Sequence, residues 1–534
     1  MRLSNFLVGM LACAAITACS NDTDSIIDNN ENDGQLSYVA INIVNANADT
    51  RITNEQAEDG TAAENGITSA RFYLFNADGT AYTVTNSATT SGGSGTNYVD
   101  VTIDDDNNPS TDAPNVEKIK EAVLVFRGTT NTQPASIVAV LNVSTESLGS
   151  NAKSLNDLTG SSSIANYGIT TDNNFVMSNS VYASGNTKVV ATNINGKIAA
   201  SETEAKENPV DIYVERAVAK VNVTFGGTKK SGTEDTYRVN GDNTPAVYAQ
   251  VKGWAVTTDN RTSNLLKDID PTKWTDDNLG FTWNDAPFYR SYWAKTPESI
   301  NPVNDKSYND IDITANGSTL SAAQYCQENT GATKTNLIVV AQLQGEDGTK
   351  HPIYKYFGVN YASANDIFNI ICSKYNGQYW TKTGDEYNEM DAEDLEFKAT
   401  SNGNGEDYEA VPQVKSGVTI YTPNAEGTGY EEATITEVNT ELAKNPAQVA
   451  PDGYVYYFTP IRHLAITTDK TGAYGVVRNH VYKITVDGIN GFGTPIFDPD
   501  KVIVPTKPED TETFIAARIN VLSWRIVSNN VTLE

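Results

Sequence analysis

The sequence predicts an all-β protein with a few short helices, and three observations support this prediction. The polar residues are mainly Asn, Thr, Ser, Asp and Gly, and they occur together with 27 Tyr in 534 residues. This mixture suits solvated strands and turns more than helices. Several segments alternate apolar and polar residues with a period of two, the pattern of a half-buried strand. Turn-rich stretches such as SGGSG at 91–95 separate these segments, which is typical of a β-sandwich.

Predicted strands follow one another along most of the chain. In the first half they are 36–44, 70–75, 98–103, 122–126 and 137–143. A second series comprises 211–225, 246–257, 335–343, 350–360, 454–459 and 480–486. Short helices are expected at 147–158 and 364–374, and in the second helix the spacing places Ile367, Ile370 and Ile371 on one buried face.

The length exceeds what one compact core accommodates, so two domains are expected and a third is left open. We expect an N-terminal β-sandwich domain at 52–208 and a C-terminal β-sandwich domain at 209–494. A linker at 495–513 follows, in which prolines favour an extended, semi-rigid chain. The last segment, 514–534, is predicted to contain a strand.

The net charge excludes one class of partner. The chain has 67 acidic and 38 basic residues, a formal charge of −29. Such a surface repels phosphate backbones and anionic lipid headgroups, so we expect no nucleic acid partner.

The chain begins with an export signal at 1–18. Arg2 precedes an apolar run that ends in small residues before Cys19, and this run is too short to cross a bilayer. The residues Ile16 to Cys19 are similar to a bacterial lipobox, which predicts cleavage before Cys19 and lipid on its thiol; a plain Ala-x-Ala type of cleavage is the alternative. The polar run up to Gly34 is then a tether that holds the body on the membrane.

No catalytic, cofactor-binding or metal-binding residues are predicted. The three histidines, His351, His463 and His480, lack the spacing of a metal pair. The acidic run that starts at Asp104 resembles a calcium loop but has Pro109 where Gly is required. We therefore expect no enzyme activity. Cys326 and Cys372 remain after processing, and both a disulfide and two separate thiols are left open.

Two segments at opposite ends of the chain have the pattern of exchangeable strands. In 36–44, Val39, Ile41 and Ile43 alternate with smaller or polar residues, and a long polar loop containing Arg51 follows. Loops of this kind are where proteases cut.

The second of these segments is 514–527, and its apolar residues fall on two parities. The first set is Ile515, Ala517, Ile519 and Val521, and the second set is Leu522, Trp524 and Ile526. A bulge near Val521 would align both sets on one core. The alternative is an ordinary last strand in the sheet of its own domain.

Several motifs resemble those of one protein family. VVRNHVYKITV at 476–486, GFGTP at 491–495 and INVLSWR at 519–525 look like the end of the Bacteroidales fimbrillins, the major subunits of type V pili. The similarity is to the Mfa type, which is related to the FimA type. VERAVAKV at 214–221 and YCQENT at 325–330 also resemble family segments, whereas 79–208 shows no such resemblance.

The resemblance implies two transthyretin-like β-sandwich domains and a route of maturation. A precursor lipidated on Cys19, with palmitate among its acyl chains, reaches the cell outer membrane. An Arg-specific protease then cuts between Arg51 and Ile52 and removes the propeptide 19–51 with its strand. Arg71 is the rival site, but it begins a predicted strand.

The function implied is that of the major structural subunit of an adhesive fimbria. Identical subunits would form a linear polymer in which 514–534 donates a strand to a neighbour. A minor or tip fimbrillin is the first alternative. A surface glycan-binding lipoprotein is the second, because Trp254, Trp274, Trp283 and Trp293 could stack on sugars. Whether the receptor is a host protein or a glycan is left open.

Overall fold

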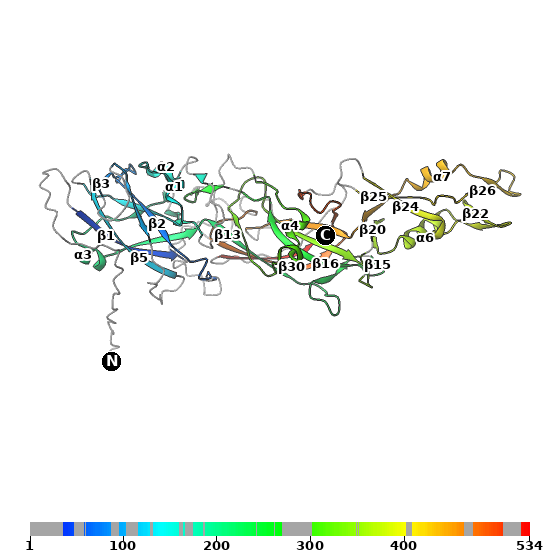
Figure 1. The fold of residues 1–534 in the computed structure, drawn as a ribbon, viewed down its shortest axis with the longest axis horizontal. Helices are drawn as coiled ribbons and strands as arrows, with labels where there is room; N and C mark the ends of the chain where they lie inside the picture. Colours follow the sequence, from blue (N-terminus) through cyan, green and yellow to red (C-terminus); the bar gives the residue numbers. More distant parts are fainter. Residues whose placement is uncertain are drawn as a thin grey trace.

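The computed structural model describes residues 36–46, 58, 60–86, 95–102, 116–128, 132–159, 164–165, 175–184, 187–241, 243–260, 262–269, 302–348, 350, 352–401, 408–463, 474–505 and 525–533. Three bodies lie in a row along an elongated molecule (Figure 1). Strands dominate all three, and the helices are short, which confirms the predicted all-β class. Among these residues, no helix combines the length and apolar character that a membrane span needs.

The first body is a nine-stranded sheet. Its path is β3-β5-β1-β12-β8-β6-β2-β4, with β11 (Thr192–Asn193) paired to β6. The strands on the path are β1 (Leu36–Ala46), β2 (Ser69–Phe75), β3 (Val84–Asn86), β4 (Tyr98–Thr102), β5 (Val116–Gly128), β6 (Ser136–Leu141), β8 (Met177–Asn179) and β12 (Val210–Arg216). A bridge between Val84 and Thr96 joins the two ends, so the sheet wraps around its own core.

The second body occupies the middle of the molecule. Its sheet runs β18-β13-β30-β14-β16-β19-β29-β31, and β32 pairs with β30. The strands are β13 (Val218–Phe225), β14 (Thr236–Asn240), β16 (Tyr248–Thr257), β18 (Gln324–Gln327), β19 (Asn336–Gln344), β29 (Tyr454–Pro460), β30 (His480–Asn490), β31 (Thr494–Pro495) and β32 (Arg525–Leu533). One apolar cluster, which includes Val221, Val339 and Tyr482, fills its interior.

The chain passes between the first two bodies at Ala217. β12 ends at Arg216 in the first sheet, and β13 begins at Val218 in the second. The sequence placed this boundary between 208 and 209 because 211–225 reads as one continuous apolar strand. The correction has a simple cause: two sheets share this run, and only a single residue separates their strands.

The third body, which we call the distal lobe, is inserted between β19 and β29. It begins with β20 (Ile353–Tyr356) and ends with β28 (Ala447–Ala450), and Ile353 lies opposite Ala450. The lobe has its own apolar core. It also contains β21 (Val359–Tyr361), α6 (Ala364–Lys374), β22 (Trp380–Thr383), β23 (Glu386–Glu389), β24 (Leu395–Ser401), β25 (Tyr408–Val414), β26 (Tyr421–Pro423), β27 (Tyr430–Glu432) and α7 (Ile435–Leu442). The sequence left open whether a third domain exists, and this insertion is a third unit. It lies at the end of the molecule that is farther from β1 (Figure 1).

Three local predictions need correction. The predicted strand at 350–360 is a hairpin, because Phe357 and Gly358 both have positive φ and form a tight turn. The predicted helix at 147–158 is two helices, α1 (Thr145–Leu148) and α2 (Leu155–Thr159), because Gly149 ends the first with φ +71°.

The third correction concerns α6. Ile367 and Ile371 are buried as predicted, but Ile370 is 41% exposed. Phe368 is buried beside the two isoleucines, which centres the apolar face close to Ile371. At 100° per residue, this face leaves Ile370 about 100° away from its centre.

A glycine lets α4 (Tyr308–Ile311) pack directly on β16. A Cβ atom at Gly253 would lie 1.9 Å from the backbone oxygen of Ile311. Gly253→Ala should therefore lower the free energy of unfolding by about 1–3 kcal/mol, because backbone atoms cannot make room easily.

Guanidinium unfolding would measure this effect. Gly429→Ala is the matched control, since the nearest atom there is an Asn424 side-chain nitrogen at 3.5 Å. Equal stability of the two variants would show that α4 does not lie on β16 as described.

Candidate assembly interface

β1 is an interior strand of the first sheet. It pairs antiparallel with β5 along its length and parallel with β12 from Ile41 to Asn45. Its backbone groups are therefore hydrogen-bonded on both sides. Among the described strands, only β1 lies between β5 and β12 and pairs with both of them.

The side chains of β1 complete the core of the first body. Val39 and Ile41 have no exposed surface and belong to the cluster that contains Leu124 and Ile212. The backbone of Ile43 lies in register with that of Ile212. The predicted removable strand is thus observed as a strand, and both of its described apolar side chains face the core.

Of the two candidate cleavage sites, Arg51 and Arg71, the structure describes only Arg71. Arg51, Ile52 and the lipidation site Cys19 lie outside the described residues. Arg71 lies inside β2, is 3% exposed, and forms two bonds of 2.6 and 2.8 Å with the carboxylate of Asp100. Its guanidinium carbon is also 3.7 Å from the ring centre of Tyr98. A protease could reach Arg71 only after the sheet had opened.

The last strand lies on its own domain in this structure. β32 pairs in parallel with β30, with Ile526 opposite Val481. Among the described residues β30 is its only partner strand, so β32 lies at the edge of the sheet. This pairing is the alternative that the sequence left open for the tail. The other predicted donor residues, Ile515, Ala517, Ile519, Val521, Leu522 and Trp524, lie outside the described residues.

Three of the motifs that carried the family resemblance meet between the first two bodies. Arg216 from VERAVAKV donates to the backbone oxygen of Glu64 at 2.9 Å and to Oδ1 of Asn479 at 3.1 Å. Arg478 from VVRNH lies 2.5 Å from Glu328 of YCQENT. Sequence reasoning found these motifs by resemblance and did not predict that their charges pair. We call this group the junction network.

The junction network is almost completely buried. The side chains of Arg478 and Glu328 are 0% and 1% exposed, and those of Lys267 and Glu215, which pair at 2.8 Å, are 1% and 2% exposed. Burial lowers the pKa of Lys267, and the nearby Glu215 carboxylate opposes this effect. Buried ions carry a large desolvation cost unless each has a partner, and Lys267 and Arg478 each lie within 2.8 Å of a carboxylate.

The segment around Glu58 and Glu64 ties the beginning of the first body to the second. Glu64 accepts from the Tyr325 hydroxyl at 2.5 Å and pairs with Lys220 at 3.0 Å, and Glu58 pairs with Lys483 at 2.5 Å. Burial alone would raise the pKa of Glu64, but its bonds to Tyr325, Thr61 and Lys220 outweigh burial and lower it. The carboxylate therefore stays ionised and holds this segment in place.

The structure also shows the surroundings of the two remaining cysteines and of Trp254. Cys326 and Cys372 are both free thiols, so the two-thiol alternative holds, and burial raises the pKa of Cys372 to about 11. Trp254 is buried, and its indole N–H donates to the Leu320 carbonyl at 2.8 Å. Trp274, Trp283 and Trp293 lie outside the described residues.

Taken together, these observations define an all-β protein whose first strand completes the interior of a sheet and whose last strand lies at the edge of another. Residues 451–530, which include β29 and β30, match the family model described as major fimbrial subunit protein type IV, fimbrillin, C-terminal. This match covers motifs that carried the resemblance, including 476–486 and 491–495, and confirms the predicted resemblance to the fimbrillins.

Comparison with other proteins adds distant structural similarities. No protein of curated function has a matching sequence. A fimbrial assembly protein from Parabacteroides distasonis is 12% identical, with 74% of this chain and 98% of that chain covered and a TM-score of 0.29. The tip fimbrial protein Mfa3 from Porphyromonas gingivalis, with a C-terminal truncation, is 11% identical, with 59% and 79% covered and a TM-score of 0.26. Neither similarity establishes a function for this chain.

The junction network gives a testable consequence. Arg478→Met should lower the free energy of unfolding by about 3–5 kcal/mol, because it leaves the Glu328 carboxylate buried without its closest cation. Chemical denaturation followed by tryptophan fluorescence would measure the loss.

The matched control is Lys444→Met, which removes a cation from the exposed Lys444–Glu441 pair on α7. This control should leave the unfolding midpoint unchanged. A similar midpoint for Arg478→Met and the original protein would show that the buried Arg478–Glu328 pair does not stabilise the fold.

Proposed function

We propose that this chain is a structural subunit of a cell-surface fimbria that polymerises by protease-triggered donor-strand exchange. The position of β1 carries the proposal: it is an N-terminal strand, and it lies in the interior of its sheet rather than at the edge. The fimbrillin match over 451–530 supports the fimbrial role.

Loss of β1 creates a vacancy that a second strand can fill. Each well-buried aliphatic side chain, such as Val39 or Ile41, stabilises the fold by roughly 1.5–3 kcal/mol. Its removal also leaves the facing backbone groups of β5 and β12 without partners. An incoming strand can satisfy both needs through main-chain ladders and alternate side-chain pockets. The cleaved subunit therefore has a strong tendency to accept one.

The surroundings of the two arginines favour a cut after Arg51. That position follows the end of β1 at Ala46 and precedes Glu58, the first residue of the anchored segment. A cut there releases β1 but keeps the ion pairs of Glu58 and Glu64 in the mature subunit. A cut after Arg71 would instead divide β2 and remove the Glu64 anchor from the junction network.

The proposed donor is the C-terminal segment 514–534. Because β32 is an edge strand, its release leaves β30 paired with β13. The preceding linker at 495–513 contains several prolines and favours an extended chain that reaches away from its own body. The alternating apolar residues of 514–527 fit the pockets of a vacated interior strand.

Donor and acceptor lie on different surfaces, so the contact need not close on itself. Heterologous contacts of this kind propagate into filaments. One chain with both a removable strand and a donor strand suits the shaft, because a tip subunit needs no donor to extend the polymer. The minor or tip fimbrillin remains the alternative assignment.

The proposal includes the path to the surface. The precursor carries lipid on Cys19 and is attached to the cell outer membrane, and an Arg-specific protease converts it into a subunit of the extracellular fimbria. Its partners are then identical subunits. In the alternative of a surface glycan-binding lipoprotein, Trp254 cannot stack on a sugar, because its indole is buried in the second body.

Cleavage can be tested at a single residue. Arg51→Ala should accumulate as precursor and form no filaments under an Arg-specific protease, because β1 stays covalently attached. Mass spectrometry should find Ile52 at the N-terminus of assembled original protein and not in the variant.

Arg238→Ala is the matched control, since it removes an exposed arginine from β14 and should be processed normally. Filaments formed by Arg51→Ala, or an N-terminus at Phe72 in assembled material, would refute a cut after Arg51.

The tail can be tested separately. Deletion of 514–534 should give folded monomers that are cleaved but do not polymerise, because an edge strand contributes less than an interior one. Size-exclusion chromatography and thermal unfolding would report assembly and folding independently.

Normal polymers without the tail would exclude it as the donor. Complete unfolding of the deletion variant would instead show that β32 is an essential strand of its own sheet.

A further inference from the structure

The distal lobe carries an aromatic surface outside its core. β22, β23, β26 and β27 form a small antiparallel sheet in which Trp380 lies opposite Tyr421 and Lys382 opposite Tyr387. Directly opposed residues point to the same face of a sheet. The aromatic residues on this face are Trp380, Tyr387, Tyr421 and Tyr430.

The four rings contact one another closely. The ring centres of Tyr387 and Tyr430 are 4.4 Å apart with nearly parallel planes, and those of Trp380 and Tyr430 are 4.9 Å apart. Tyr421 meets Tyr387 edge-on at 5.1 Å. None of the four belongs to the buried core of the lobe, and all remain partly exposed. The group is therefore a surface feature with a defined geometry.

The phenol groups on this surface are available to a ligand. Within the part of the lobe that the structure describes, the hydroxyls of Tyr387, Tyr421 and Tyr430 have no hydrogen-bond partner. Half-exposed tyrosines with an apolar body and an unused hydroxyl suit a ligand that is itself apolar on one side and polar at its edge.

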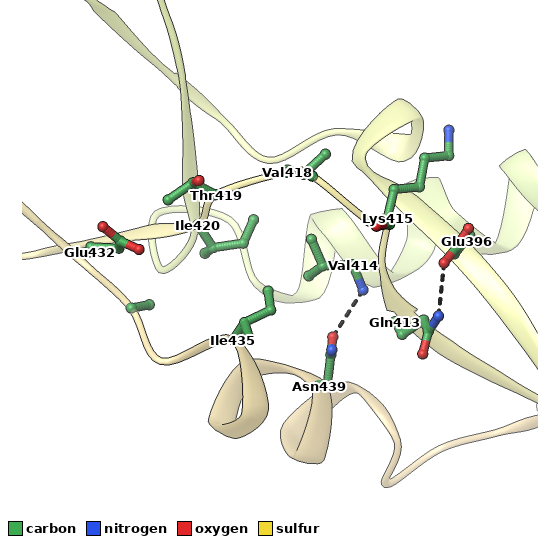
Figure 2. A pocket seen from close by; sticks show the side chains of 13 residues that line it. Glu396, Gln413, Val414, Lys415, Val418, Thr419, Ile420, Glu432, Ile435 and Asn439 are labelled. Carbon is green, nitrogen blue, oxygen red and sulfur yellow. Dashed lines mark hydrogen bonds between the residues drawn. The ribbon is translucent and has the colours of Figure 1, made fainter.

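A cleft adjoins the aromatic face. It has a volume of about 420 Å³ and lies between β25, β27 and α7. Figure 2 shows Glu432 at one end, Gln413 and Glu396 at the other, and Ile420 and Ile435 between them. Glu432 is two residues from Tyr430 on β27 and lies opposite Tyr421, so it belongs both to the cleft and to the aromatic face.

The polar groups of the cleft are held in place by the protein. Gln413 donates to the Glu396 carboxylate at 2.8 Å, and the Asn439 side-chain oxygen accepts from the Val414 amide at 2.9 Å (Figure 2). The lining of the cleft is more polar than apolar, which suits a ligand rich in hydroxyl groups.

The charge of the lobe narrows the ligand class. Between 353 and 450 acidic residues greatly outnumber lysines, and there is no arginine or histidine. Glu386, Glu389 and Glu431 lie on or beside the aromatic strands and outnumber the one lysine on this face, Lys382, whose Nζ is 5.2 Å from the ring centre of Tyr387. Such surroundings repel sialylated, sulfated or phosphorylated ligands.

We propose that the aromatic face and the adjoining cleft of the distal lobe form a binding site for neutral oligosaccharides. The apolar C–H face of a pyranose packs against the rings, and its hydroxyls bond to the tyrosine hydroxyls and to Glu432 and Glu396. The site lies in the insertion between β19 and β29, away from β1 and the junction network (Figure 1). Binding therefore does not depend on whether the chain polymerises.

The test uses the purified, uncleaved full chain on an array of neutral oligosaccharides and their sialylated counterparts. We expect binding to neutral glycans and little to the sialylated forms. The tightest neutral glycan then serves as the probe for titration calorimetry. Tyr387→Ala should weaken its binding at least about tenfold, whereas Tyr387→Phe should retain most of it because the ring remains.

Phe357→Ala is the matched control. This side chain is 73% exposed at the β20–β21 turn of the same lobe, so the variant also loses a surface aromatic residue but outside the proposed site. It should bind as the original protein does. Glu432→Gln should weaken binding several-fold, and since this side chain is exposed the variant should fold normally.

Several outcomes would overturn the proposal. One is the absence of binding to any neutral glycan, and another is a preference for sialylated forms. Equal binding by Tyr387→Ala and Phe357→Ala would place the ligand elsewhere. Self-association that Tyr387→Ala abolishes, without glycan binding, would identify the face as a contact between copies. Filament assembly of Tyr387→Ala after proteolysis should be normal, which separates this proposal from the donor-strand proposal.

Discussion

The interior position of β1 is the constraint on which the rest of the structure depends. A strand at the edge of a sheet is hydrogen-bonded to one neighbouring strand, so its departure breaks one set of backbone hydrogen bonds. β1 is instead paired with both β5 and β12, and its Val39 and Ile41 side chains lie in the core. The first body is complete only while some strand occupies this position. Its own N-terminal segment fills it in the form described here, and the sheet geometry does not require that the strand come from the same chain.

The junction network explains how such a body could lose a strand without losing its place in the molecule. Arg216 ends β12, the parallel neighbour of β1. Its guanidinium donates to Glu64 at the beginning of the first body and to Asn479 of the second body. Glu64 lies after the proposed cut and is held by Tyr325 and Lys220. The contacts that fix the two bodies together therefore belong to residues that would remain in the mature chain.

The sequence predicted the fold class and the presence of a strand at 36–44, because both depend on local alternation of apolar residues such as Val39 and Ile41. The interior position of this strand depends on its pairing with β5 and β12, which local alternation does not reveal. The sequence predicted the domain organisation less well. The distal lobe enters and leaves through the paired strands β20 and β28, a long-range pairing that no local pattern reveals. The pairing of Arg478 with Glu328 joins residues far apart in the chain, and only the resemblance pointed to their motifs. Sequence reasoning also missed the aromatic face, since its four rings come from four strands.

The place of the insertion has a further consequence for the assembled form. Ile353 and Ala450 lie opposite each other, so the chain enters and leaves the lobe through two adjacent strands, and the pairing of β19 with β29 stays intact. The sheet that holds β30 and β32 is thus continuous whatever the lobe contains. The lobe also contacts the second body through β21, which pairs with β15 (Asn243–Thr244). In the proposed donor-strand mechanism, assembly depends on β1, β30 and the tail, and substitutions on the surface of the lobe leave these elements untouched. A subunit that assembled in this way could change the ligand that the lobe recognises and still polymerise with its neighbours.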